Sequence, residues 1–325
     1  MTRLLKSTFI TLIATMALTS CSDDDTTKDI GNWITSTVFD GSPRSSAVIF
    51  ADENFAYLGT GYDGDDYLTD FWRYNIDGGY WEQIADFPGE PRSSATGFMV
   101  NGFGYVGTGY NGTEELADFY KYDTTTGIWT PIADFGGTPR RAAVGFNSVT
   151  AGYVGSGFDG QNDRKDFWKY IPEEDTWIEL FGFGGNKRRE ATTFTIDNFV
   201  YFGTGISNGS HQDDFWKFDT QSETWTRLTD LDDDDDYSIM RSQATAFAIG
   251  SYGYICGGDN GNSVWEYDPS TDKWRSKTDF EAASRVDAVA FSNGIRGFVG
   301  LGKSGTYYFD DMMEFLPFED QEDDD

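Results

Sequence analysis

The sequence predicts an all-β protein in which six similar units of four strands each close into a ring, the arrangement called a β-propeller. Three observations predict this fold. The segment DFWRY at Asp70–Tyr74 returns as DFYKY, DFWKY and DFWKF, each 48 residues after the one before. Aromatic residues make up 17% of the chain, with 38 glycines and only 8 prolines, which is typical of short strands joined by tight turns. All ten tryptophans fall into two columns when the chain is aligned on the repeated segment.

Three columns of residues run through the units. The first aromatic column is Trp33, Trp81, Trp129, Trp177, Trp225 and Trp274. The second is Trp72, Tyr120, Trp168, Trp216 and Trp265, with Met313 in the sixth unit. An arginine followed three residues later by alanine stands at Arg44, Arg92, Arg140, Arg188, Arg241 and Arg285. We expect the aromatic columns to pack between neighbouring blades, because rings repeated at one position of every unit serve the fold.

Each unit is expected to contain four strands, which the second unit illustrates. An apolar strand at Ala95–Val100 follows the arginine, and a second at Tyr105–Gly109 ends in Gly-x-Gly. The third strand is the repeated segment, and the fourth begins at the tryptophan, as in Trp129–Ala133. GTGYDG at Gly59–Gly64 also matches a dinucleotide fingerprint, but that fingerprint requires a following helix and here another strand follows.

The two ends of the repeat region complement each other. Trp33 has no first three strands before it, and the unit at Arg285–Phe315 has no fourth strand after it. We therefore predict that Asn32–Phe39 completes the last blade and closes the ring.

These motifs resemble the kelch repeat, in which Arg-x-x-Ala, a glycine doublet, and tyrosine and tryptophan stand at fixed offsets. The doublet is usually GTG here, as at Gly59–Gly61, and only Gly257–Gly258 gives the familiar Gly-Gly pair. The resemblance covers about residues 31–318, extends to the central domain of galactose oxidase, and implies a six-bladed propeller. The copper site of galactose oxidase needs histidines, but this chain has one, His211. A copper or zinc site built on histidine, and a Ser/Cys–His nucleophile, are therefore excluded.

The amino terminus has the features of a secretory signal, with basic Arg3 and Lys6 before an apolar stretch at Phe9–Leu18. Its ending, LTSC, resembles the lipobox of bacterial lipoproteins, which implies that Cys21 is lipidated. The SDDD that follows resembles a signal for export to the outer face of a Gram-negative outer membrane. The alternatives are a plain secretory peptide and a polar spacer. The expected organisation is a signal peptide at 1–20, an acidic tether at 21–30, the propeller at 31–318 and an acidic tail at 319–325.

Charge and cysteine content limit which partners and cofactors we expect. A formal net charge of −31 argues against nucleic acid, since phosphate binding needs a basic surface. We expect a monomer that meets the membrane only through its lipid. With Cys21 lipidated, Cys256 has no disulfide partner. No cofactor is expected, although Asp63–Asp66 and Asp232–Asp236 offer oxygen ligands that leave calcium open.

The six repeated arginines allow two interpretations. They can form fixed structural pairs with the aspartates that precede the third strand, or they can line the channel mouth as a positive well for a carboxylated sugar or acidic peptide. The aspartates are Asp70, Asp118, Asp166, Asp214 and Asp311, with Ser263 the exception.

Positions that vary between units on the open face are candidates for ligand contact. Arg141 and Arg189, together with Tyr62, Tyr110 and Phe158, provide planar donors and flat apolar faces that suit a sugar, although ordinary loop variation would give the same residues. We expect a binding module for a glycan or a partner protein, rather than an enzyme. The alternatives are an envelope scaffold with no small ligand, and a sugar enzyme similar to sialic-acid epimerases, with Glu190 as its acid/base candidate.

Overall fold

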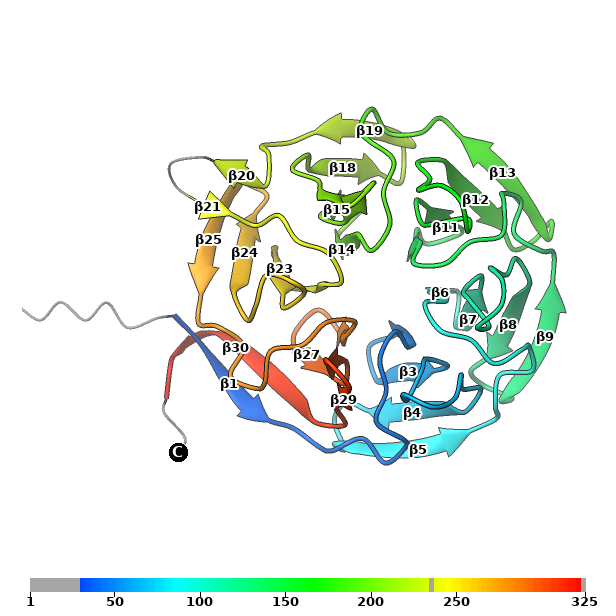
Figure 1. Cartoon of the computed structure of the whole chain (residues 1–325), viewed down its shortest axis with the longest axis horizontal. Coiled ribbons are helices and arrows are strands. Elements are labelled where there is room, and N and C mark those ends of the chain that lie inside the picture. Colours follow the sequence, from blue (N-terminus) through cyan, green and yellow to red (C-terminus); the bar gives the residue numbers. More distant parts are fainter. Residues whose placement is uncertain (1–29, 234–236, 323–325) are drawn as a thin grey trace, which may run out of the picture.

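The computed structural model describes residues 30–233 and 237–322, and these form a ring of six four-stranded antiparallel sheets (Figure 1). The described residues contain strands and turns only, and none forms a helix able to cross a membrane. The predicted signal peptide, Cys21, residues 22–29 of the tether and residues 323–325 of the tail lie outside the described residues, as do residues 234–236 of the aspartate run.

The first five blades follow one another along the chain, each with its strands ordered from the channel outward. Blade 1 consists of β2 (Val48–Ala51), β3 (Phe55–Gly59), β4 (Phe71–Asn75) and β5 (Tyr80–Ile84). Blade 2 consists of β6 (Thr96–Val100), β7 (Phe103–Gly107), β8 (Phe119–Asp123) and β9 (Ile128–Ile132). Blade 3 consists of β10 (Val144–Asn147), β11 (Gly152–Gly155), β12 (Phe167–Ile171) and β13 (Thr176–Leu180).

The same order continues around the ring. Blade 4 consists of β14 (Thr192–Ile196), β15 (Phe199–Gly203), β18 (Trp216–Asp219) and β19 (Thr224–Arg227). Blade 5 consists of β22 (Thr245–Ile249), β23 (Tyr252–Cys256), β24 (Val264–Asp268) and β25 (Lys273–Lys277). Three short hairpins project from the loops: β16 (Ile206–Ser207) with β17 (Ser210–His211), β20 (Asp232–Asp233) with β21 (Tyr237–Ser238), and β28 (Lys303–Ser304) with β29 (Tyr307–Tyr308).

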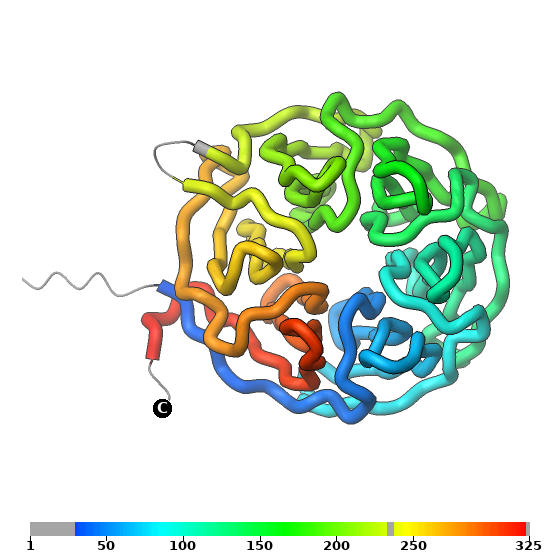
Figure 2. The backbone as a smooth tube through the Cα atoms, viewed as in Figure 1, coloured from blue at the N-terminus to red at the C-terminus, as the bar shows by residue number. Residues whose placement is uncertain are grey.

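Blade 6 is built from both ends of the repeat region, which confirms the predicted closure, although the closing strand is Ile30–Thr35 and not Asn32–Phe39. Its strands are β26 (Val289–Ser292), β27 (Gly297–Gly300), β30 (Met312–Asp320) and, outermost, β1 (Ile30–Thr35). The two ends run side by side in Figure 2, and Trp33 pairs with Phe315 in antiparallel register. Trp33 is buried against the rings of Phe280 and Phe315, at centroid distances of 4.9 and 4.5 Å.

The second predicted strand of each unit extends too far. In blade 2 the strand ends at Gly107, and Thr108 and Gly109 already adopt positive φ angles of 56° and 102°. Thr108 is not glycine, so this left-handed conformation is uncommon, and it turns the chain toward the channel mouth. The Gly-x-Gly motif therefore belongs to the turn and not to the strand.

The hydrophobic core lies between neighbouring blades, as the aromatic columns predict. Trp129 of blade 2 packs against Phe71 of blade 1, with ring centroids 5.1 Å apart. On the second strands of blades 2, 3, 5 and 6, a glycine faces a phenylalanine of the previous blade: a Cβ at Gly152 would clash with the ring of Phe98. Glycine is required there by close approach, because the neighbouring ring occupies the space of a side chain.

Candidate ligand site at the channel mouth

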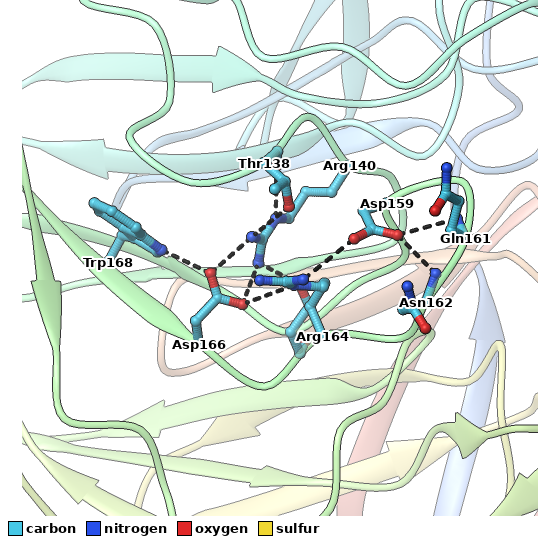
Figure 3. A network of polar contacts seen from close by, with 9 residues as sticks. Thr138, Arg140, Asp159, Gln161, Asn162, Arg164, Asp166 and Trp168 are labelled. Atoms are coloured by element: carbon cyan, nitrogen blue, oxygen red, sulfur yellow. Dashed lines mark hydrogen bonds and ion pairs between the residues drawn. The ribbon is translucent and has the colours of Figure 1, made fainter.

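The repeated arginines lie inside the blades, as blade 3 shows (Figure 3). Arg140 donates from Nη2 to Asp166 Oδ2 at 2.8 Å, and from Nη1 to the carbonyl oxygen of Ser156 at 2.9 Å. Trp168 of the second aromatic column donates its indole N–H to the same carboxylate at 2.8 Å. Burial acts to raise the pKa of Asp166, but the hydrogen bonds and charge of Arg140 outweigh it and lower that pKa from 3.8 to about 2.

The other blades repeat this arrangement. Arg44, Arg92 and Arg285 each contact their aspartate at 2.6 Å, and Arg188 pairs with Asp214. Arg241 instead donates to the hydroxyl and carbonyl oxygens of Ser263. All six arginines are at most 2% exposed. These contacts support the structural interpretation, because neighbouring aspartates, Ser263 and backbone oxygens occupy the donors of the six arginines. Their burial argues against the predicted contact with a ligand.

The second residue after each arginine forms the throat of the central channel. These residues are Ser46, Ser94, Ala142, Glu190, Gln243 and Asp287, and all six have φ between 51° and 57°. Their backbones are linked around the axis, as by Ser94 N–H to the Ser46 carbonyl oxygen at 2.8 Å and by Ala142 N–H to the Ser94 carbonyl oxygen at 3.0 Å. This backbone ring directs the six side chains, of five residue types, toward one narrow opening.

Above the throat, a cavity of about 320 Å³ opens on the loop face. Antiparallel bridges Ser45–Tyr62 and Ser93–Tyr110 hold the residue after the arginine beside the residue after the Gly-x-Gly turn. The two sets of variable positions found by internal alignment therefore meet at one surface. The walls of the cavity include Tyr62, Tyr67, Tyr110 and Arg141.

Aromatic rings form a continuous rim across blades 1 to 3. The ring of Tyr67 lies 4.9 Å from that of Tyr62 and 6.0 Å from that of Tyr110, centroid to centroid. The guanidinium carbon of Arg141 lies 4.4 Å from the Tyr110 centroid and 5.2 Å from that of Phe158, where cation–π attraction holds it. The guanidinium carbon of Arg189 also lies over the Phe158 ring, 5.0 Å from its centroid. The structure thus brings together Arg141, Arg189, Tyr62, Tyr110 and Phe158.

The charges at the mouth are mixed rather than positive. Arg141 lies 3.2 Å from Glu115, and Arg189 lies 2.6 Å from Asp163 and 3.4 Å from Glu190. Asp287 accepts a hydrogen bond from Gln243 at 2.9 Å and lies 3.6 Å from Lys303.

Glu190 and Asp287, the two carboxyl groups of the throat, both have pKa values raised by burial. Burial raises the pKa of Glu190, and the charge of Asp287 raises it further against the opposing effect of Arg189. Burial likewise raises the pKa of Asp287, against the opposing charge of Lys303. The predicted positive well is therefore replaced by two carboxyl groups at the floor and paired cations on the wall.

Sequence reasoning did not single out Tyr67, Gln243 or Asp287. Gln243 and Asp287 occupy the same unit position as Glu190, the second after the arginine, so internal alignment contained the signal for both. Tyr67 matches Glu115, Asp163 and His211 at intervals of 48 residues, and each of the four pairs across its loop with the residue after the Gly-x-Gly turn, so internal alignment contained the signal for this variable position as well. Among the described residues, no group of three His, Cys, Asp or Glu side chains is arranged to hold a metal. In the Asp63–Asp66 loop, which offered oxygen ligands for calcium, Asp63 Oδ1 accepts hydrogen bonds from the N–H groups of Asp65 and Asp66.

Comparison with known proteins supports the fold. The Kelch motif family matches residues 240–280, the unit that carries the Gly257–Gly258 doublet. The solved structure of YjhT has a TM-score of 0.73 to this chain at 15% sequence identity, covering 86% of this chain and 96% of that one. At this identity the likeness concerns the fold alone. A comparison with curated protein sequences finds no match.

Proposed function

We propose that this kelch-type six-bladed β-propeller is a carbohydrate-binding module whose ligand lies over the channel mouth. The observation that carries the proposal is the rim of Tyr62, Tyr67 and Tyr110 on the wall of a cavity whose floor holds Glu190 and Asp287. Flat aromatic faces stack on the C–H faces of a sugar ring, while carboxylate and serine oxygens accept from its hydroxyl groups.

The ion pairs of Arg141 and Arg189 favour a ligand that is uncharged where it lies at the mouth. Arg141 and Arg189 are already paired with acids, so a carboxylated sugar at the mouth would have to displace Glu115 or Asp163. A polyhydroxylated ring needs no such exchange, because its hydroxyl groups both donate and accept. This replaces the acidic-sugar pocket expected from the sequence with a neutral sugar site.

Removing two of the three tyrosines of the rim is expected to weaken sugar binding without unfolding the protein. A thermal-shift screen with neutral oligosaccharides should show stabilisation of about 2.7 kcal/mol when a ligand is present at 100 times its Kd. Tyr62→Ala combined with Tyr110→Ala should weaken that ligand at least about tenfold, since two stacking faces are lost. Tyr80→Ala is the matched control, because Tyr80 is an exposed tyrosine on the outer strand β5. Binding that is equal in all three proteins would contradict the site, and no binding to any sugar would move the proposal to a protein partner.

Glu190 favours a second candidate function, proton transfer to a bound sugar. Its carboxyl group lies at the floor of the cavity, and burial raises its pKa toward the range useful to a general acid or base. The same protein–sugar samples, followed by NMR, test it. Conversion of the sugar that Glu190→Gln abolishes while binding persists would establish catalysis, and unchanged sugar would leave a binding protein.

We also propose that lipidated Cys21 anchors the propeller to the outer face of a Gram-negative outer membrane, on the strength of LTSC and the acidic residues after it. Protease added to intact cells should then degrade the propeller. Cys21→Ser should release the protein from the membrane fraction. Protection from protease in intact cells, with degradation after the outer membrane is opened, would contradict the surface location.

A further inference from the structure

A second cavity, of about 490 Å³, lies between blades 3 and 4 on the loop side. One wall is formed by residues 162–166, from the connection between β11 and β12, and the other by residues 185–187, from the connection between β13 and β14. Its walls carry three cationic residues: Arg164, Lys165 and Lys187. We call this cavity the cationic groove.

The cations of the groove outnumber the acids free to neutralise them. Asp163 accepts from Arg189 at 2.6 Å and from the N–H of Asn208 at 2.9 Å, so it serves the neighbouring site. Asp166 serves Arg140 and Trp168, as Figure 3 shows.

Arg164 has only longer contacts, 3.3 Å to Asp159 and 3.5 Å to Asp166, and its side chain is 34% exposed. Lys165 is exposed and Lys187 half-buried, and within the described part of the chain neither has an acidic side chain at ion-pair distance. The groove therefore keeps a local positive charge in a chain whose formal charge is −31.

The fold does not require these cations. At intervals of 48 residues, the positions that match Arg164 hold Leu68, Leu116 and Gln212. Those that match Lys165 hold Thr69, Ala117 and Asp213, and those that match Lys187 hold Pro91 and Pro139. Blades therefore form with apolar, polar or acidic residues at these sites. Three cations that converge at one blade junction indicate a ligand rather than a structural need.

The groove is adjacent to the channel mouth. Asp163 lines the groove and binds Arg189, which in turn contacts Glu190 at the floor of the mouth. A ligand of several sugar units could therefore occupy both places. We infer that the cationic groove binds a carboxylate or sulfate group carried by the same oligosaccharide whose neutral part lies at the mouth, an inference that rests on the proposed function. Exposed ammonium and guanidinium groups recognise such oxyanions by charge-assisted hydrogen bonds.

A matched series of galactose-based hexasaccharides tests the groove. The series is a neutral galactan, an oligogalacturonate with carboxylate groups and a sulfated carrageenan, each titrated into the full-length protein by calorimetry at low salt. One or both acidic hexasaccharides should bind about tenfold more tightly than the neutral one, since each exposed ion pair contributes modestly. The preference should shrink as salt rises. The overall negative charge of the protein would act in the opposite direction, so it cannot produce this preference.

Two double variants decide where the preference originates. Lys165→Ala/Lys187→Ala should remove it while leaving affinity for the neutral galactan unchanged. Lys121→Ala/Lys273→Ala removes the same charge from blades 2 and 5 and should retain the preference. The groove inference is overturned if acidic and neutral hexasaccharides bind the unmodified protein equally, or if the preference survives in Lys165→Ala/Lys187→Ala.

The outcomes also separate this inference from the proposed function. Equal binding of all three hexasaccharides, lost in Tyr62→Ala/Tyr110→Ala, would leave the mouth site standing and remove the groove. Binding of the acidic hexasaccharides that depends on the two lysines but not on the tyrosines would support the groove and contradict the mouth site. Absence of binding by every hexasaccharide would overturn the groove inference, and absence of binding by every sugar of the neutral screen would overturn the mouth site.

Discussion

A chain that begins at Asp40 should fail to form a stable propeller. It lacks β1, so β30 becomes an open edge strand of nine residues and blade 6 loses its outer strand. It also lacks Trp33 and Phe39, which are each 2% exposed and pack against aromatic rings of the last and first blades. Exposed edges of this kind pair with other chains, so aggregation should accompany the loss of stability.

The expected loss is comparable with the whole stability of a domain. Removal of one buried aromatic side chain costs about 3–5 kcal/mol, and two are removed here together with a strand ladder. Domains of ordinary stability unfold with only about 5–15 kcal/mol. The shortened chain should therefore be largely unfolded, or should melt at least about 10 °C below the complete propeller.

Thermal denaturation followed by circular dichroism measures this effect. A chain that begins at Ile30 is the control and should melt like the full-length protein, because it keeps the whole of β1. A peptide of residues 30–39 added to the shortened chain should restore part of the stability by strand addition. If the chain that begins at Asp40 melts like the control, the ring does not depend on this closure.

Arg140→Met should destabilise blade 3 by about 3–5 kcal/mol, the usual cost of removing one partner of a buried ion pair. The side chain of Arg140 is fully buried and that of Asp166 is 14% exposed. After the substitution, the Asp166 carboxylate keeps Trp168 and loses its main counter-charge. Chemical denaturation should show this loss directly.

Blade 5 provides the internal control for that substitution. Arg241 has the same buried position but faces the oxygens of Ser263 instead of a carboxylate. Arg241→Met loses hydrogen bonds without leaving a buried charge, so it should cost less than Arg140→Met. Equal losses would show that backbone hydrogen bonds, and not the carboxylates, account for the arginine column.

The same ion pair should shape acid unfolding. Arg140 lowers the pKa of Asp166 from 3.8 to about 2, so the folded state favours the ionised carboxylate. The resulting stabilisation, about 2 kcal/mol, is complete above pH 3.8 and is lost as the pH falls toward 2. Arg140→Met should therefore show a shallower fall in stability across this interval than the unmodified protein.

The architecture followed from the sequence because a propeller repeats its chemistry. Six copies of the arginine, of the glycine turn and of the aromatic columns revealed four strands per blade, and the missing strands at the two ends revealed the closure. Strand limits were less predictable. The sequence predicts Thr108 as part of a strand, but its positive φ places it in the turn. The side chain of threonine gives no indication of that backbone conformation.

The candidate site was harder to predict because it depends on which way side chains point. Arg140 and Arg141 are adjacent in sequence and equally basic, yet one is buried between strands and the other lies on the rim between Tyr110 and Phe158. Repetition distinguishes them: every unit has arginine at the position of Arg140, whereas the residue type at the position of Arg141 differs between units. Glu190 was singled out but Asp287 was missed, because the two come together only through the backbone ring around the axis.

A comparison of Arg140→Met with Arg141→Met separates the residues that maintain the fold from those proposed to bind the ligand. Repeated positions maintain the fold, and we propose that variable positions at the loop face contact the ligand. Unfolding free energy and affinity for a bound oligosaccharide should be measured for both variants under one set of conditions. Arg140→Met should lose about 3–5 kcal/mol of stability while its folded fraction keeps the affinity, whereas Arg141→Met should lose affinity and less than about 1 kcal/mol of stability. Equal destabilisation by both, or unchanged affinity in Arg141→Met, would contradict this division between structural and ligand-binding positions.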